Sequence, residues 1–249
     1  VILCRCKVLI SYKFFSFFDI FSYTFFFVRR LSFLLAGILA TVIFKGCEGC
    51  GMEKFVITGT EEGLHGRVKI SGAKNAVLPI LAACLLTKEV CEIQNVPPLA
   101  DVRHMAELLT ELGARVEYDA AAETMRVQAA ELTHVEGAYE TARKMRASFL
   151  AAGALLARCG AARLPLPGGC RIGSRPIDLH LKGFHLMGAK SRQAHGMVEL
   201  QAKTLRGSDI YLDFPSVGAT ENILLAATRA KGITTIENAA AEPEICDLA

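Results

Sequence analysis

The segment LAAGALL (residues 150–156) decides the fold, because related segments recur before and after it at a nearly constant spacing. ILAACLL occupies residues 80–86 and LLAATRA occupies residues 224–230, so three apolar helix cores lie about 70–75 residues apart. A repeated supersecondary unit buries its apolar face by stacking on its neighbours. The sequence therefore predicts three copies of one structural unit that share a core.

Each helix core is followed by an apolar strand and a turn that contains proline. The predicted strands lie at residues 90–96, 162–166 and 233–238. After the turn comes an acidic residue suited to cap a second helix, namely Asp101, Asp178 or Asp247. In the first two copies this helix ends at a Gly-Ala pair, at 113–114 and 188–189, as a C-cap glycine requires.

Short strands then close each copy, and they are predicted at residues 115–118, 125–129, 197–202 and 210–213. The predicted unit is therefore βαβαββ. The fold class is α/β (α+β), and the third copy is expected to be incomplete.

Composition separates the first 51 residues from the rest. Residues 1–51 hold ten of the 14 phenylalanines, six of the 28 basic residues and two of the 25 acidic residues. From Met52 onward 22 basic residues face 23 acidic ones, so this part lacks the basic surface that nucleic acid requires. Five of the nine cysteines remain there without paired spacing. This predicts reduced thiols in a cytoplasmic protein, four of them packed in apolar runs.

Residues 1–51 admit three interpretations. The apolar run 31–44 after Arg29-Arg30 is a signal-peptide core or a short membrane segment, although a spanning helix needs about 20 residues. The CEGC motif at 47–50 is a weak zinc signature, because a single CxxC lacks a second pair at usable spacing. We favour the third interpretation, that the segment is not natural protein, since the chain begins with Val and Met52 resembles a start. A membrane is a partner only if the segment is genuine.

The segment GGCRIGSRP (168–176) sets Cys170 and Arg175 among glycines. Glycines let backbone amides approach an anion, and arginine binds phosphate or carboxylate bidentately. A thiol surrounded by positive charge loses its proton easily. The segment is either a loop that closes on a phosphorylated or carboxylated substrate, or a surface turn that holds a packed cysteine.

Two further motifs place cations at helix starts. SGAKNA (71–76) puts Lys74 and Asn75 where backbone amides favour an anion, although Ser71 or Asn75 acting as a simple N-cap is the alternative. KMRAS (144–148) puts Arg146 at the start of another helix, where a solvated basic face is the alternative. Three such motifs in one chain favour a site for a substrate with several negative charges.

At these residues the chain resembles the UDP-N-acetylglucosamine 1-carboxyvinyltransferase (UDP-GlcNAc enolpyruvyl transferase) family. The resemblance covers Met52–Ala249 and implies the N-terminal portion of such a protein, truncated at its C-terminus. The segments that carry it are SGAKNAVLPILAA (71–83), EIQNVP (92–97), KMRAS (144–148), LPGGCRIGSRPIDLH (166–180), DFPSVGATENI (213–223) and IENAAAEPEI (236–245).

The resemblance implies an inside-out α/β barrel of two domains, each made of three βαβαββ units, with the active site between them. Residues 52–73 would then be the first strands of a split domain, and residues 74–249 most of the second domain. Because the other half of the cleft would lie outside this sequence, we expect the chain alone to be inactive.

The implied reaction transfers enolpyruvyl from phosphoenolpyruvate to the 3′-hydroxyl of UDP-N-acetylglucosamine and releases phosphate, the first committed step of peptidoglycan synthesis. It needs no metal or organic cofactor. Cys170 would be a proton donor, a covalent nucleophile or both, and the catalytic set is Cys170, Lys74, Arg146 and Arg175. The implied substrate-binding residues are Lys74, Asn75, Arg146, Arg175, Pro176, Ile177, Asp178, Leu179, Ser216, Val217 and Gly218.

Several alternatives stay open. Asp178 is also explained as a helix cap, and His180 is as readily a packing residue as a ligand. Phe214 stands where some family members carry a lysine, so the role of this position is undecided. The chain as a whole is alternatively a relative of 5-enolpyruvylshikimate-3-phosphate synthase without a functional cysteine, a non-catalytic nucleotide-sugar binding fragment, or a membrane-anchored protein.

Overall fold

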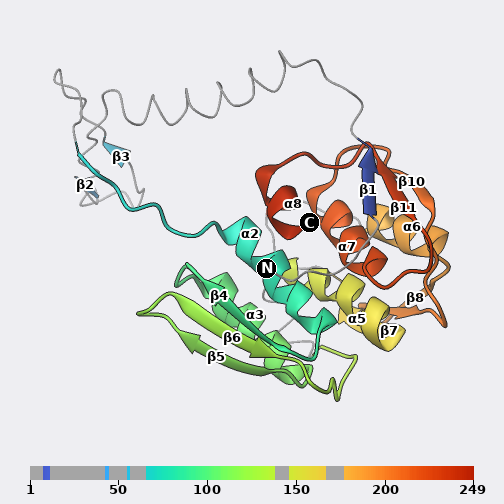
Figure 1. Cartoon of the computed structure of the whole chain (residues 1–249), viewed down its shortest axis with the longest axis horizontal. Coiled ribbons are helices and arrows are strands. Elements are labelled where there is room, and N and C mark those ends of the chain that lie inside the picture. Colours follow the sequence, from blue (N-terminus) through green and yellow to red (C-terminus); the bar gives the residue numbers. More distant parts are fainter. Residues whose placement is uncertain (1–7, 12–42, 45–54, 57–65, 138–145, 167–176) are drawn as a thin grey trace, which may run out of the picture. The chain divides into compact units, whose positions relative to one another are not determined.

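The computed structural model describes residues 8–11, 43–44, 55–56, 66–137, 146–166 and 177–249 (Figure 1). The chain divides into two compact units, one of residues 1–12 with 71–249 and the other of residues 13–70. In the smaller unit β2 (Ile43–Phe44) pairs antiparallel with β3 (Phe55–Val56). The assignment of residues 52–73 to a separate split domain stays a prediction.

The larger unit begins with a first repeat whose helices and strands alternate. Its elements are α2 (Lys74–Ala83), η1 (Cys84–Leu86), β4 (Val90–Gln94), α3 (Ala100–Glu111), β5 (Arg115–Asp119) and β6 (Thr124–Gln128). The three strands form an antiparallel sheet in the order β4-β6-β5. Helices α2 and α3 pack against each other beside this sheet (Figure 1).

A second repeat has the same strand order. Its elements are η2 (Arg146–Leu150), α5 (Ala151–Cys159), β7 (Ala161–Pro165), α6 (Asp178–Leu186), β8 (Lys190–Ala194) and β9 (Met197–Gln201). The sheet is antiparallel in the order β7-β9-β8. The prediction that strand 210–213 closes this copy together with strand 197–202 is wrong, because residues 209–211 form β10, which pairs with a strand of the third part. The true partner of β9 is β8, which has the polar sequence KSRQA and shows no apolar alternation.

The third part of this unit contains β10 (Asp209–Tyr211), α7 (Val217–Ala227), β11 (Thr234–Glu237) and α8 (Pro243–Leu248). Strand β11 pairs in parallel with β10 and with β1 (Val8–Ser11). The predicted capping role of Asp247 is wrong, because α8 begins at Pro243 and has Glu244 in its first turn. A proline at the first helical position begins a helix readily, since its missing N–H has no intrahelical acceptor there.

Asp101 and Asp178 do not cap their helices either. Helix α3 has Leu99 at its N-cap and α6 has Ile177, neither with a side-chain cap bond, and each aspartate lies inside the first turn. A carboxylate in that position stabilises a helix through the macrodipole. The sequence therefore placed the helix starts correctly but assigned the acids the wrong contact.

The predicted C-cap glycines are confirmed. Gly113 and Gly188 have φ values of +102° and +92°, which glycine adopts without the steric cost of a Cβ. The next residue in each repeat donates its N–H across the helix end, from Ala114 to the Leu109 carbonyl and from Ala189 to the Phe184 carbonyl. Both helices thus end in the same Schellman-type turn.

The three predicted helix cores form the interior. Residues 151–156 of α5 and residues 219–227 of α7 are buried on every side, and α5 packs against both α2 and α7. A Cβ on Gly153 would lie 2.3 Å from the Asn222 carbonyl oxygen, so only glycine permits this approach of α5 to α7. In β4 and β5 alternate residues are exposed, so one face of this sheet lies toward solvent. The predicted α/β class is confirmed.

The described cysteines differ in how far they are buried. Cys84 is buried and Cys91 half-buried, but Cys159 and Cys246 are exposed, so the prediction of four packed thiols is wrong for the last two. Cys159 is the last residue of α5 and Cys246 lies within the short helix α8, and at both places an apolar neighbourhood in sequence does not imply burial. In the part of the chain that the structure describes, no helix has both the length and the apolar character needed to cross a membrane.

Candidate substrate-binding site

The start of α2 carries Lys74 and Asn75 as its first two residues, both exposed. The N-cap is Ala73, which forms no side-chain cap bond, so the alternative that Ser71 or Asn75 caps this helix is wrong. The Lys74 Nζ lies 3.1 Å from the Asp101 Oδ2 at the start of α3. The side chains are 48% and 36% exposed, so water screens this ion pair and it holds Lys74 only weakly.

The start of α7 is built differently. Ser216 is its N-cap, and the Ser216 Oγ accepts a hydrogen bond from the Ala219 N–H at 3.4 Å. The Ser216 carbonyl accepts from both the N–H and the hydroxyl of Thr220. Ser216, Val217 and Gly218 are half-buried. A capped helix start with a partial positive charge is suited to hold an anion through its backbone amides.

At the start of α6, burial separates three predicted contacts. Ile177 and Leu179 are 6% and 4% exposed, whereas Asp178 between them is exposed. Only Asp178 therefore presents its side chain to solvent or a ligand, and the other two can contribute only backbone groups. Pro176, Arg175 and Cys170 lie outside the described residues.

A buried hydrogen-bond network joins α7 to α5, α6 and η2. The Asn222 Nδ2 lies 3.0 Å from the His180 Nδ1 and 3.1 Å from the Phe149 carbonyl oxygen, and the Asn222 Oδ1 accepts from the Gly153 N–H at 2.8 Å. The His180 ring meets the Phe149 ring edge to face, with centroids 5.3 Å apart. His180 is 8% exposed, and Asn222 and Phe149 beside it are buried, so the packing interpretation accounts for these contacts.

Element contacts bring the predicted motifs into one region. Helix η2, which begins at Arg146, packs against α2, α3 and α7, and α6 packs against α7. The backbone of Arg146 is described, but its side chain is not. The structure thus places the segments of Lys74, Arg146, Asp178 and Ser216 on contacting elements, while the side-chain distances among the predicted cations stay untested.

Two residues of this region were missed by sequence reasoning, Asn222 and the Lys74 partner Asp101. The signal for Asn222 is the pair Glu221-Asn222 inside the apolar helix core, where each polar side chain needs a buried partner. Asp101 was noticed only as a helix cap. Its pairing with Lys74 depends on how α2 and α3 pack, which no local pattern reveals.

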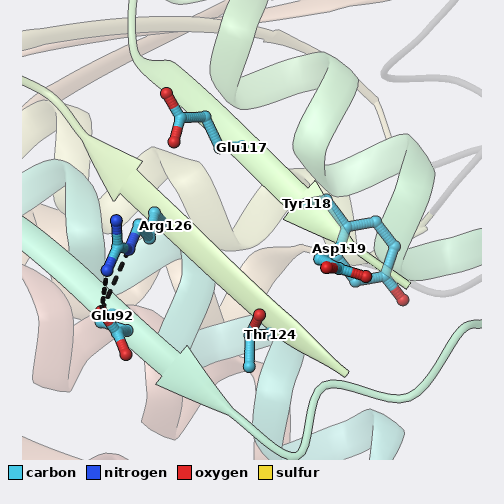
Figure 2. A pocket seen from close by; sticks show the side chains of 6 residues that line it. All are labelled: Glu92, Glu117, Tyr118, Asp119, Thr124 and Arg126. Carbon is cyan, nitrogen blue, oxygen red and sulfur yellow. Dashed lines mark hydrogen bonds and ion pairs between the residues drawn. The ribbon is translucent and has the colours of Figure 1, made fainter. Parts of the chain in front are cut away.

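Two surface hollows lie away from these motifs. One of about 340 Å³ is on the outer face of the β4-β6-β5 sheet and is lined by Glu92, Glu117, Tyr118, Asp119, Thr124 and Arg126 (Figure 2). There the Arg126 Nη2 pairs with the Glu92 Oε2 at 2.8 Å. The other, of about 360 Å³, lies at the end of α5. Neither is lined by a predicted site residue, and the described ranges hold no cluster of His, Cys, Asp and Glu suited to a metal.

Curated relatives are similar to this chain over most of its length. UDP-N-acetylglucosamine 1-carboxyvinyltransferase 2 of Carboxydothermus hydrogenoformans is 58% identical over 198 residues, which are 80% of this chain and 46% of that protein. UDP-N-acetylglucosamine 1-carboxyvinyltransferase of Gloeobacter violaceus is 54% identical over 186 residues, 75% of this chain and 40% of that protein. The chain thus spans less than half the length of these relatives.

Solved structures agree at the level of the fold. The enolpyruvyl transferase NikO from Streptomyces tendae superposes with a TM-score of 0.65 at 27% identity, over 74% of this chain and 43% of that one. An EPSP synthase from Acinetobacter baumannii superposes with a TM-score of 0.57 at 18% identity, over 72% of this chain and 42% of that one. Residues 59–249 match the family model described as EPSP synthase (3-phosphoshikimate 1-carboxyvinyltransferase), and the chain therefore belongs to the EPSP synthase family.

Proposed function

We propose that the protein containing this chain transfers the enolpyruvyl group of phosphoenolpyruvate to the 3′-hydroxyl of UDP-N-acetylglucosamine and releases phosphate. The observation that carries the proposal is the 58% identity to a protein named UDP-N-acetylglucosamine 1-carboxyvinyltransferase 2. The similar EPSP synthase structure shares only 18% of its residues with this chain. A nucleotide sugar is therefore the better-supported acceptor.

The chemistry requires cations and a proton donor in one place. Phosphoenolpyruvate carries a phosphate and a carboxylate, which Lys74, Arg146 and Arg175 would bind. Because exposed ion pairs contribute about 0–1 kcal/mol, a substrate anion can replace Asp101 beside Lys74 at little cost. In the addition step the 3′-hydroxyl gives its proton to a base and its oxygen bonds to C2 of phosphoenolpyruvate, while the C2=C3 double bond opens and C3 takes a proton. In the elimination step C3 loses a proton, the double bond re-forms and the C2–O bond to the leaving phosphate breaks.

Cys170 is the proposed donor of the proton to C3, a covalent nucleophile toward C2, or both. The nucleotide sugar would be held by Asn75 at the start of α2 and by Asp178 at the start of α6, with Ile177 and Leu179 contributing backbone groups. Pro176 completes this set. The amides of Ser216, Val217 and Gly218 would bind the diphosphate, and the helix start at Ser216 supports this role.

The wider setting follows from the same proposal. The chain would supply most of one domain of an inside-out α/β barrel, and the burial of α5 and the solvent-exposed face of the β4-β6-β5 sheet support that arrangement. The reaction would serve peptidoglycan precursor synthesis in the cytoplasm, and through cell-wall growth it would affect cell shape, division and the cell cycle.

The test is a chimera in which this chain is completed at its C-terminal side with the remainder of the Carboxydothermus relative. We expect phosphate release from phosphoenolpyruvate that requires UDP-N-acetylglucosamine and does not occur with shikimate 3-phosphate. Cys170→Ala should lower the rate at least about 100-fold, because proton transfer by a positioned group contributes about that factor. The exposed Cys159 is the matched control, and Cys159→Ala should leave the rate unchanged.

Two results would contradict the proposal: turnover with shikimate 3-phosphate as acceptor, or full activity after Cys170→Ala. The 249-residue chain alone should release no phosphate from the two substrates. Steady release by the chain alone would overturn the expectation that a second half of the cleft is needed.

A further inference from the structure

The side chain of Asn222 is fully buried in the middle of α7, although its neighbours in the helix core are mostly apolar. A buried amide is costly unless its donors and acceptor are paired. Here the Oδ1 accepts from the Gly153 N–H of α5, and the Nδ2 donates to the Phe149 carbonyl of η2 and lies 3.0 Å from the His180 Nδ1 of α6. One side chain therefore bonds to three other elements.

This network fixes the orientation of the amide group. The Gly153 N–H can only donate and the Phe149 carbonyl can only accept, so the oxygen of Asn222 must face the first and the nitrogen must face the second. The same nitrogen then donates its other hydrogen to the His180 Nδ1. The imidazole of His180 is consequently neutral and carries its proton on Nε2.

The other edge of the His180 ring rests against the first turn of α7. A Cβ built on Gly218 would lie 3.3 Å from the His180 Cε1 and 3.5 Å from its Nε2, so the ring is in close contact with this glycine. Phe149 packs edge to face on the ring from η2. The position of the imidazole thus sets the spacing between the start of α6 and the start of α7, which pack against each other.

We infer that Asn222 is a positioning residue of the nucleotide-sugar site, acting through His180. By fixing the tautomer and orientation of that imidazole, it aligns the start of α6, which carries Asp178, with the start of α7, which carries Ser216 and Gly218. The inference rests on the proposed function, because that function assigns the nucleotide sugar to these helix starts. Asn222 itself is fully buried and touches no substrate.

The experiment has two readouts on the 249-residue chain. The first is ¹⁵N NMR of the His180 ring without ligand, in which we expect a protonated Nε2 and an unprotonated Nδ1. The second is the dissociation constant for UDP-N-acetylglucosamine, followed by NMR titration. Asn222→Asp keeps the acceptor for the Gly153 N–H but removes both donors. We expect it to move the ring proton to Nδ1 and to weaken binding by about 10- to 100-fold, as the loss of a buried network in contact with the site does.

A double-mutant cycle separates positioning from general stability. If Asn222 acts through His180, Asn222→Asp should weaken binding much less in a His180→Ala background than in the unmodified chain. The matched control is Thr228→Val at the other end of α7, which removes the hydrogen bond from the Thr228 Oγ1 to the Leu225 carbonyl at 2.7 Å. This variant should lose stability and keep its affinity.

The outcomes distinguish the inference from the proposed function. A His180 ring protonated on Nδ1 in the unmodified chain overturns the inference, and this reading does not depend on any variant folding. Unchanged affinity of Asn222→Asp, or fully additive effects in the cycle, also overturns it and leaves the proposed function intact. Failure of the unmodified chain to bind the nucleotide sugar overturns the inference, whereas the proposed function is tested separately by the chimera, because the other half of the cleft would lie outside this chain.

Discussion

The repeat from α2 to β6 and the repeat from η2 to β9 have the same strand order and the same helix ends, but different contacts hold their helix starts. In the first repeat, an exposed ion pair joins Lys74 to Asp101 within the repeat. In the second, a buried amide supplied by the next repeat, Asn222, bonds to Phe149 and His180.

The two repeats therefore share the arrangement of their strands and helix ends, whereas their helix starts carry different residues with different contacts. The helix start of the first repeat carries Lys74, whose side chain is exposed to water. The helix start of the second repeat is fixed by buried hydrogen bonds, which are strong because no water competes for them.

The largest expected loss of stability tests whether the buried interiors of the two repeats are equivalent. Phe184 in α6 and Leu109 in α3 occupy matching positions and are fully buried. Phe184→Ala should lower the free energy of unfolding by about 4 kcal/mol and Leu109→Ala by about 3 kcal/mol, since each leaves a cavity. Urea unfolding followed by circular dichroism measures both. Leu186→Ala in the same helix as Phe184, at a side chain 47% exposed, should change it by less than about 0.5 kcal/mol.

The glycines that end α3 and α6, Gly113 and Gly188, give a second comparison of the two repeats. Gly113→Ala should destabilise by about 3 kcal/mol, because its Cβ would meet the backbone N of Thr133 at 2.8 Å in addition to the strain of positive φ. Gly188→Ala should cost only about 1 kcal/mol, since its nearest neighbour would be the Thr204 carbonyl oxygen at 3.8 Å. Thermal and urea unfolding of the two variants give the difference. Equal losses would show that positive φ alone sets the cost.

Thiol reactivity gives a third comparison. The neighbouring Cys84 thiol lowers the pKa of Cys91 to about 7, whereas burial raises the pKa of Cys159. Because the thiolate is the nucleophile, iodoacetamide at pH 7 should alkylate Cys91 about ten-fold faster than Cys159, and lowering the pH below 7 should slow the reaction of Cys91. Mass spectrometry of digests measures both rates. Cys84→Ala should remove the advantage of Cys91, and a rate independent of Cys84 would contradict the assigned cause.

The smallest expected effect concerns the ion pair at the start of α2. Asp101→Asn should change the free energy of unfolding by less than about 0.5 kcal/mol, and added salt should shrink the change further. The matched control is Asp213→Asn in the third part of the unit, which removes the partner of Lys182 of the second repeat at 2.9 Å. A loss above about 1.5 kcal/mol at Asp101 alone would mean that Lys74 is held structurally and is not ready to bind an anion.

Much of the fold could be predicted from the sequence. The three helix cores, their following strands and the glycine ends at 113 and 188 were placed correctly, because apolar period and glycine chemistry are local signals. Strand β8 was missed, since its polar residues lie at the sheet edge beside β9 and carry no alternation. The segment at Ile210 was given the wrong partner, because strand pairing is decided by contacts distant in sequence.

For the candidate site, Lys74 came from a local motif, because a helix start offers its amides whatever surrounds it. Ser216 came from the family resemblance. Which groups meet was settled only by folding: Asp101 reaches Lys74, and Asn222 reaches Gly153, Phe149 and His180, across 69, 73 and 42 positions. Such pairs carry no local pattern, since their free energy arises only when packed helices remove both partners from water.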